Sequence, residues 1–409
     1  MSEYLPIWKG IELGSRFKIE AFLGEGSFGK VAQCLDVVTD TKVAIKVTKD
    51  KPHLTKQALE EIKILQELTA LDADRCNLVK WDGFFLHEQL ICLRFELLDM
   101  SLFDYMEQRD FLPMDMNQVR PVLHQLTTAL LHLETLKLIH ADLKPDNVMV
   151  VDCRQETLKV KIIDFGLARH AADVIPGSCT QSLLYRAPEV MLGLDYAEQI
   201  DMWSLGLITM DITLGFQLFP GSHHYDMLKF IVDTLGPIPD YLVNWGQYST
   251  QFFNIVGTFN EQTWELKTPE EFASITGHQF VDNRDFELQS LDVLEEMMTF
   301  TDEAARIQMR NLLDLVKQML HVDKNERIIP KKVLQHPFFV EQHSSQVTAD
   351  VKSTIAEPEP SYEEIDAESV SALLIDFEPE VKTKKRGGRV KRFFKRMKKA
   401  VVSFFHHAG

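Results

Sequence analysis

The spacing of apolar residues changes between residues 17 and 68. Between Phe17 and Val47, short runs rich in β-branched residues flank a glycine cluster, a pattern typical of an antiparallel sheet. From about Lys56 onward the apolar positions recur near helical spacing, at Ala58, Ile62, Leu65 and Leu68. This part of the chain therefore predicts a small sheet followed by one main helix.

Further along, the same helical spacing predicts helices from Val119 to Leu138 and from Met309 to Leu320. From His343 to Val381 the composition shifts to Ser, Glu, Asp and Pro, with few large apolar residues. Such a segment cannot bury a core, so we expect a flexible acidic linker over 343–381.

Composition and charge narrow the class of protein. The 409 residues are 45% apolar and 26% charged, as in a soluble globular protein, and allow one large bilobal domain with tails. The net charge of −17 divides into −19 for 1–342, −9 for 343–381 and +11 for 382–409. No apolar run is long enough to span a membrane, and five scattered cysteines favour an intracellular protein without structural zinc.

A glycine-rich motif lies between the first two predicted strands. Gly24-Glu25-Gly26-Ser27-Phe28-Gly29 fits G-x-G-x-x-G, but a plain glycine turn fits as well. The next residues read as a strand, whereas a dinucleotide-binding motif opens a helix. A glycine hairpin between strands can place backbone N–H groups against phosphates.

Lys46 lies within the apolar run of the next strand. Its ammonium either snorkels to solvent or binds nucleotide phosphates while a carboxylate from the following helix holds it. Glu61 is the candidate carboxylate, and Glu60 is a competitor one position away.

A third set of motifs supplies groups for phosphoryl transfer. His140-Ala141-Asp142-Leu143-Lys144-Pro145-Asp146-Asn147 precedes Asp164-Phe165-Gly166 and then Ala187-Pro188-Glu189. We predict that Asp142 orients the acceptor hydroxyl and that Lys144 neutralises the transferred phosphate. Asn147 and Asp164 are the predicted metal ligands.

Together these motifs make the chain resemble the eukaryotic protein kinases over roughly residues 17 to 340. The resemblance implies an α+β bilobal fold, with a small antiparallel β-sheet lobe and hinge at 17–98 and a larger, mainly helical lobe at 99–342. It also implies ATP and Mg²⁺ as cofactors and protein substrates. Lys144 matches the serine/threonine branch.

The resemblance implies specific contacts with the nucleotide. Adenine would bind the connecting strand at Glu96 to Leu98, with Phe95 guarding the pocket behind it. The complete set implied for nucleotide binding is Leu23, Gly24, Glu25, Gly26, Ser27, Phe28, Gly29, Val31, Ala44, Lys46, Glu96, Leu98 and Met149.

More specific stretches are similar to the homeodomain-interacting protein kinases, relatives of the dual-specificity tyrosine-regulated kinases. These stretches are Arg120 to Leu123, Leu138 to Pro145, Ile200 to Gly206, Phe252 to Asn254 and Leu266 to Pro269. The similarity implies an insert at about 237–306. The broader kinase resemblance implies two architectural interactions: Asp201 with the catalytic loop, and Glu189 with Arg327.

The activation segment departs from that family at two positions. Cys179 stands where those kinases carry an autophosphorylated tyrosine, and Leu183 stands where they carry a supporting arginine. We therefore predict a segment that is ordered by packing, and activity without tyrosine phosphorylation. Ser182 still matches the hydroxyl next to the catalytic aspartate, while a preference for proline after the acceptor is left open.

The last 28 residues read as a basic amphipathic helix. Its apolar positions are Val390, Phe393, Phe394, Met397, Val401, Phe404 and Phe405, among eleven Lys and Arg residues in 382–409. An anionic membrane, calmodulin and an import receptor are alternative partners, and a solvated tail that touches the acidic linker is another alternative. Residues 372–378 resemble a weak SUMO-interacting strand, or are a plain apolar patch.

The sequence as a whole predicts an active serine/threonine kinase acting on regulatory or transcription-related proteins in the nucleus, the cytoplasm or both. The competing hypothesis is a catalytically weak kinase-fold scaffold that recruits transcriptional regulators. Direct nucleic-acid binding is not expected, because the acidic body opposes it.

Overall fold

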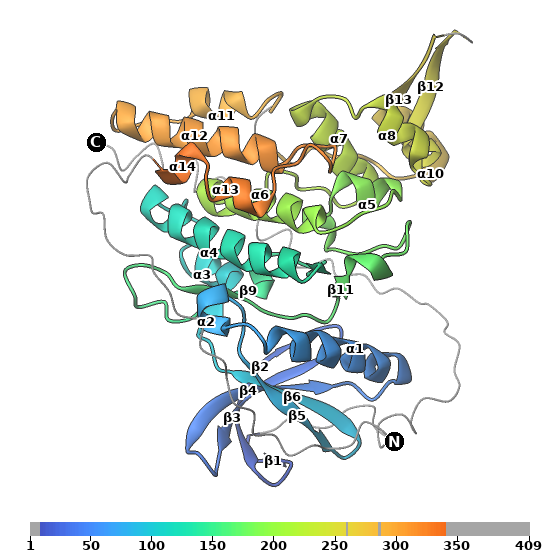
Figure 1. Cartoon of the computed structure of the whole chain (residues 1–409). Helices are drawn as coiled ribbons and strands as arrows, with labels where there is room; N and C mark the ends of the chain where they lie inside the picture. The colour runs from blue at the N-terminus through green and yellow to red at the C-terminus, as the bar shows by residue number, and fades with distance from the viewer. Residues whose placement is uncertain (1–8, 259–260, 285–287, 341–409) are drawn as a thin grey trace.

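A computed structural model describes residues 9–258, 261–284 and 288–340 (Figure 1). The chain forms a sheet lobe that carries one long helix and a larger, mainly helical lobe (Figure 1). The predicted linker at 343–381, its apolar run at 372–378 and the basic tail at 382–409 lie outside the described residues.

The small lobe is one antiparallel sheet in the order β1-β2-β3-β4-β6-β5. Its strands are β1 (Glu12–Leu13), β2 (Phe17–Glu25), β3 (Gly29–Asp36), β4 (Thr41–Thr48), β5 (Trp81–His87) and β6 (Leu90–Glu96). The sheet begins before the predicted boundary at 17, because Leu13 pairs with Phe17 and is fully buried.

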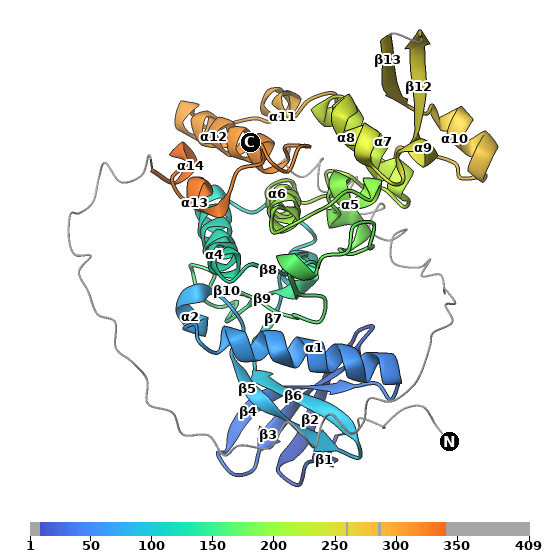
Figure 2. The ribbon, with the colours of Figure 1, turned by 45° about the vertical axis from the view of Figure 1, so that its right-hand side comes forward.

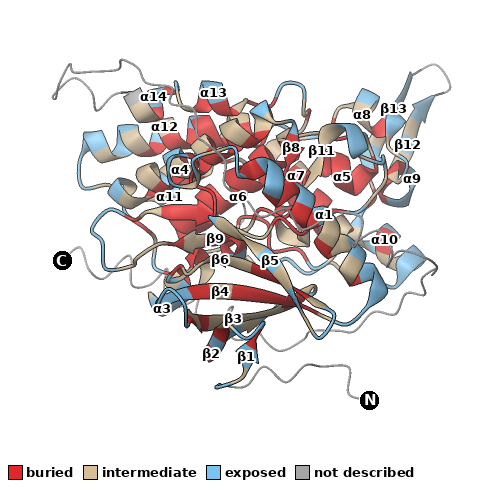
Figure 3. Ribbon diagram, turned by 60° about the horizontal axis from the view of Figure 1, so that its bottom comes forward, coloured by how far each residue is buried: buried red, intermediate tan, exposed pale blue. Residues whose placement is uncertain are grey.

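Strand alternation separates two faces of this sheet. Ala32, Cys34, Val43, Ile45 and Val47 pack together on one face, and β4 is largely buried (Figure 3). The positions between them therefore point to the opposite face, toward the helical lobe.

The helix α1 (Pro52–Leu68) contacts β4 and β6. It begins four residues before the predicted Lys56, with Pro52 in its first turn, a position where the missing N–H of proline costs nothing. The four predicted apolar positions are buried, and so is Glu61.

The helical lobe is built around α6 (Gln199–Leu214), which is buried at every position after its first residue. Helices α4 (Met116–Thr135) and α12 (Glu303–Met319) contact α6. The predicted end of α4 at Leu138 is wrong: the backbone reverses at Lys137, where φ is +57°, and Leu138–Ile139 form the strand β8.

Short elements complete this lobe. They are α2 (Ala73–Cys76), β7 (Met100–Ser101), α3 (Leu102–Gln108), β9 (Val148–Val150), β10 (Val160–Ile162), β11 (Arg169–His170), α5 (Pro188–Leu192), α7 (His224–Leu235), α13 (Pro330–Val333), α14 (Pro337–Val340) and the 3-10 turns Pro145–Asn147, Ala171–Asp173 and Leu183–Tyr185. Strands β7, β9 and β10 form a small sheet, and β8 pairs with β11.

Most of the predicted insert forms a group of elements at one end of the helical lobe, whereas its last helix, α11 (Asp292–Met297), lies beside α12 (Figure 2). The insert comprises α8 (Asp240–Trp245), α9 (Ser249–Phe252), a hairpin of β12 (Phe253–Thr258) and β13 (Glu261–Leu266), α10 (Pro269–Thr276) and α11. The hairpin projects away from the core (Figure 2).

Two sequence expectations can be compared with these elements. All five cysteines are free. Among the described residues, no helix combines the length and the apolar character needed to cross a bilayer.

Candidate active site

One side of the candidate site is formed by the small sheet, on the face opposite to the cluster of Ala32, Cys34, Val43, Ile45 and Val47. Val31 pairs with Lys46, and Ala44 lies two residues before Lys46 on the same face. Val31 and Ala44 are half-buried. These predicted nucleotide contacts therefore share one surface above the catalytic loop.

The glycine motif forms the turn between β2 and β3, as predicted. A Cβ atom added at Gly24 or Gly26 would meet nothing within 4 Å, whereas one at Gly29 would lie 2.4 Å from the Val47 carbonyl oxygen. The first two glycines thus leave open space beside the backbone, and the third permits close packing of the strands.

Side chains of this turn fall into two groups. Leu23, Glu25 and Ser27 are exposed, and Lys49 Nζ lies 2.8 Å from a Glu25 carboxylate oxygen and 2.8 Å from the Gly26 carbonyl. Phe28 is half-buried, and its ring centroid lies 5.8 Å from Lys46 Nζ.

Lys46 is held by two carboxylates. Its Nζ lies 2.7 and 2.8 Å from the two carboxylate oxygens of Glu61 and 2.8 Å from Asp164 Oδ1. The competitor Glu60 is exposed, so α1 presents Glu61 to the site. Burial opposes the charge, but the carboxylates of Asp164 and Glu61 outweigh it and hold the pKa of Lys46 above its usual value.

The connecting strand is fixed from behind by Glu96. Its carboxylate accepts the Lys80 backbone N–H at 2.6 Å and the Lys161 ammonium at 2.6 Å, and Lys161 is 1% exposed. The Glu96 side chain is therefore committed to structure, which leaves only its backbone for adenine.

The next part of the connecting strand fits an adenine ring. Leu98 is buried, and no acceptor for its backbone N–H is found within the described ranges. Phe95 lies in β6, and Met149 is a half-buried residue of β9. An unpaired buried N–H is costly unless a ligand satisfies it.

The catalytic loop places several donors around Asp142. Lys144 Nζ lies 2.5 Å from Asp142 Oδ2, and Ser182 donates to Oδ1 from its backbone N–H at 3.0 Å and from its hydroxyl at 2.7 Å. Lys144 also contacts Ser182 Oγ at 3.0 Å. Asn147 Nδ2 donates to the Asp142 carbonyl at 2.8 Å. The amide oxygen of Asn147 therefore points away from that carbonyl.

Asp164 lies beside this loop because the backbone N–H of Ile163 donates to the Asn147 carbonyl. Gln57 from α1 donates to the Gly166 carbonyl at 2.7 Å. Phe165 is buried edge-on against His140, with ring centroids 5.2 Å apart. Burial would raise the pKa of Asp164, but Lys46 lowers it below the usual range, which keeps the carboxylate ionised.

Asp201 anchors the catalytic loop, as predicted. Its two carboxylate oxygens accept the backbone N–H groups of His140 at 2.6 Å and Ala141 at 2.9 Å. Burial raises the pKa of Asp201 to about 6, although these donors oppose the shift.

The activation segment is held by a buried amide that the sequence analysis missed. Gln181 Nε2 donates to Ser204 Oγ at 2.9 Å and to the Ile200 carbonyl at 3.0 Å, and its Oε1 accepts the Ala187 N–H at 3.0 Å. Its backbone N–H binds the Ala141 carbonyl at 2.9 Å. The segment is thus tied to both the catalytic loop and α6.

Arg186 is the second residue that the sequence analysis missed. Its guanidinium donates to the Thr180 carbonyl at 2.9 Å and to the Gln181 carbonyl at 2.6 Å, and it contacts His224. Burial and the nearby guanidinium lower the pKa of His224 to about 4, so a neutral imidazole faces the cation. The prediction of order by packing is therefore incomplete, because hydrogen bonds from Gln181 and Arg186 contribute to it.

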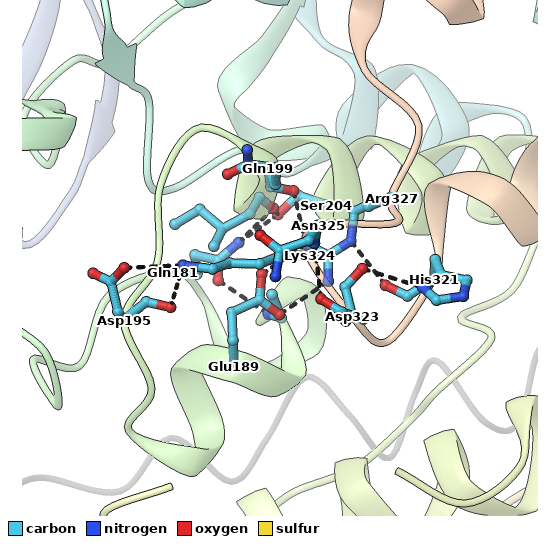
Figure 4. A network of polar contacts seen from close by, with 12 residues as sticks. Gln181, Glu189, Asp195, Gln199, Ser204, His321, Asp323, Lys324, Asn325 and Arg327 are labelled. Carbon is cyan, nitrogen blue, oxygen red and sulfur yellow. Dashed lines mark hydrogen bonds and ion pairs between the residues drawn. The ribbon is translucent and has the colours of Figure 1, made fainter. Parts of the chain in front are cut away.

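Glu189 and Arg327 form a buried, bidentate ion pair below this segment, as predicted (Figure 4). The two N–O distances are 2.7 and 2.9 Å. Arg327 also donates to the carbonyls of Gln199 at 2.9 Å and His321 at 3.0 Å. Removing one partner would leave the other charge buried and unpaired.

These residues fit a nucleotide triphosphate and a divalent cation. The open backbone at Gly24 and Gly26 and the ammonium of Lys46 suit phosphate oxygens. Asp164 and the amide oxygen of Asn147 are the hard oxygen ligands that Mg²⁺ prefers.

The profile described as "Protein kinase domain" matches residues 17–339. Homeodomain-interacting protein kinase 1 of Mus musculus is 39% identical over 333 residues, covering 80% of this chain and 28% of the relative. Homeodomain-interacting protein kinase 1 of Caenorhabditis elegans is 35% identical, and the match covers 81% of this chain and 41% of the relative. Homeodomain-interacting protein kinase 4 of Homo sapiens is 33% identical, and the match covers 79% of this chain and 54% of the relative. The chain therefore spans only about a quarter to a half of the length of these relatives.

Proposed function

The chain belongs to the protein kinase family, and we propose that it transfers the γ-phosphate of ATP to serine and threonine hydroxyls of proteins. The observation that carries this proposal is the convergence of donors on Asp142, beside the Lys46–Glu61–Asp164 cluster. In a chain of this family, that arrangement has the groups required at both ends of the transferred phosphate.

Each residue has a distinct task in this proposal. Asp142 accepts the proton of the substrate hydroxyl, while Ser182 and Lys144 hold its carboxylate in place. Lys144 also neutralises charge on the transferred phosphate. Lys46 binds phosphate oxygens, and Glu61 keeps the ammonium directed at them. Asn147 and Asp164 would hold Mg²⁺, which neutralises charge that develops on the phosphates when it is bound.

We further propose that the enzyme is active without tyrosine phosphorylation of the activation segment. Cys179 lacks an acceptor hydroxyl, and Gln181 and Arg186 already bind the neighbouring backbone. Phosphopeptide mapping tests this proposal. A phosphotyrosine in 177–185, with activity lost when a phosphatase removes its phosphate, would contradict it.

The geometry of Gln181 favours proline directly after the acceptor residue. Gln181 has a φ of +64°, and its carbonyl accepts from Arg186. Ser182, the residue after Gln181, binds Asp142, so a hydroxyl presented to Asp142 would bring the substrate backbone after the acceptor toward this carbonyl. A substrate N–H would find the carbonyl occupied, whereas proline has no N–H to satisfy.

Phosphoamino acid analysis tests the acceptor class. Serine, threonine and tyrosine versions of one basic peptide would be compared under initial-rate conditions. Labelling of the serine and threonine peptides alone is the expected result. Comparable labelling of the tyrosine peptide would replace the proposal with a dual-specificity kinase.

The second candidate function is a kinase-fold scaffold, which Cys179 and Leu183 favour because both depart from the similar kinases. Regulatory or transcription-related proteins are proposed as partners in either case, on the basis of similarity to proteins named homeodomain-interacting. The nucleus, the cytoplasm or both are the proposed compartments, and fractionation of cells expressing the full chain tests this.

A further inference from the structure

The insert presents exposed aromatic residues on one side of the helical lobe. Trp245 and Tyr241 are one turn apart on α8, and they are 82% and 53% exposed. Side chains at i and i+4 lie on the same helix face. Large aromatic residues exposed together are typical of an interaction surface.

The hairpin extends this surface. Trp264 of β13 donates from its indole to Asn244 Oδ1 at 2.8 Å and from its backbone to Asp240 Oδ1 at 3.1 Å. Ile255 pairs directly opposite Trp264, so both side chains lie on the same face of the hairpin. Ile255 is 53% exposed. We call Tyr241, Trp245, Ile255 and Trp264 the α8 platform.

Carboxylates surround the platform. Tyr241 donates its hydroxyl to the carboxylate of Asp323, and Glu326 is close enough to contribute to the raised pKa of Tyr241. Asp240 lies beside Trp264. A partner that covers these aromatics without burying unpaired anions must itself carry positive charge.

The net charge of the whole insert also favours a positively charged partner. Residues 237–306 contain 13 acidic and 3 basic side chains, a net charge of −10, which is more than half of the −19 carried by 1–342. Of the three basic residues, Lys267 is buried on two backbone carbonyls and Arg284 pairs with Asp282. Arg310 and Lys317 of α12 pair with Glu295 and Asp292 of α11. The part of the insert around the platform, residues 237–281, still carries five acidic side chains against one lysine.

The chain contains one segment with the complementary properties. Residues 390–405 contain eight large apolar residues, four of them phenylalanines, and six Lys or Arg residues. Phenylalanines can pack on the aromatic platform, and lysine or arginine can lie over the ring of Trp245. Residues 341–389 separate this segment from the end of α14, and such a length spans at most roughly 160 Å.

From these observations we infer that the α8 platform is an intramolecular docking site for residues 390–405 of the same chain. Tethering raises the effective concentration of the segment far above that of a free partner. The acidic linker at 343–381 is a poorer occupant of the platform, because its net charge of −9 adds to that of the insert. Docking would make the basic segment inaccessible to membranes and receptors while it is bound.

Photocrosslinking of the full chain tests this inference. Trp245 would be replaced by p-benzoylphenylalanine, which keeps an aromatic ring on the platform, and Val38 would carry the same probe in a control chain. Val38 is 72% exposed and lies outside the insert. The inference predicts crosslinks from position 245 to residues 390–405 in a monomeric product at all protein concentrations, and none from position 38.

A second measurement uses trypsin on the full chain. In the Trp245→Ala variant we expect cleavage at Lys391 to Lys399 to become about tenfold faster, with Lys352 as the internal reference and Val38→Ala as the control variant. Equal melting temperatures would show that both variants are folded. Crosslinks to 343–381 or to a second copy, absence of crosslinks to the tail, or unchanged cleavage would each overturn the inference.

Discussion

Substituting Gln181 by methionine tests whether a buried amide, without any phosphate, orders the activation segment. Methionine fills a similar volume but can neither donate nor accept the hydrogen bonds that Gln181 makes. Gln251→Met is the matched control, because Gln251 is an exposed glutamine of the same chain.

Gln181→Met lowers the free energy of unfolding through each hydrogen bond that the Gln181 side chain loses. The buried N–H of Ala187 loses its acceptor, Oε1 of Gln181, which costs about 1–3 kcal/mol. Ser204 Oγ keeps its bond to the Tyr185 carbonyl at 2.8 Å, so losing the amide bond to Ser204 costs only about 0.5–1.5 kcal/mol. The variant should lose about 2–4 kcal/mol in total, which a domain of ordinary stability survives.

Denaturant unfolding and initial-rate kinetics measure the two consequences. We expect Gln181→Met to lose that free energy of unfolding and about tenfold or more in kcat, because Ser182 next to it positions Asp142. Gln251→Met should match the wild type in both assays. A Gln181→Met protein with wild-type stability and kcat would refute this account of the activation segment.

Four further predictions concern other parts of the chain. Arg327→Met should lower the unfolding free energy by about 3–5 kcal/mol in denaturant titrations, because Glu189 is left buried and unpaired; an unchanged midpoint would contradict this. Burial raises the pKa of Asp211 to about 8 in the folded protein, so the folded state binds the extra proton and stability should fall as pH rises from about 4 to about 8. Asp211→Asn should remove part of that slope, and an identical slope would show that Asp211 does not titrate in this window. Glu61→Gln should lower kcat/KM about tenfold or more, whereas Glu60→Gln should stay near wild type, and equal losses would contradict the assignment of Glu61. Finally, peptides with proline after the acceptor should be better substrates than matched alanine peptides, and equal rates would argue against the role given to the Gln181 carbonyl.

The residues that carry the proposed chemistry could be predicted because each lies in a short local motif. Lys46 lies in a strand, Asp142 and Asn147 share one loop, and Asp164 follows soon after. The partner of Lys46 was left open between Glu61 and Glu60. The structure decides for Glu61, because this residue lies on the buried face of α1 while Glu60 is exposed.

The support of the activation segment could not be predicted in the same way. The partners of the Gln181 side chain come from α6 and from the residues that follow Gln181, at separations of up to 23 residues. A glutamine in a polar loop carries no local signal of burial. The role of Arg186 has no local signal either, because only the fold shows that its guanidinium binds the backbone at Thr180 and Gln181.

Element ends were less predictable than element types. The apolar spacing continues past the end of α4 because Leu138 is buried, but it is buried as a strand residue paired with β11. Strand β1 is only two residues long, and its apolar Leu13 is buried through pairing with β2. In both cases pairing with a second strand, and not the local apolar spacing, determines where the element begins or ends.

The most direct test of the proposed function is magnesium-dependent transfer of radiolabelled phosphate from ATP to a basic protein and to the chain itself. Wild type would be compared with Asp142→Asn and Lys46→Met, after confirming that all three proteins are folded. The account predicts transfer by the wild type and its loss in both variants. A folded wild type that transfers no phosphate, particularly one that still binds ATP, would contradict it and favour the scaffold.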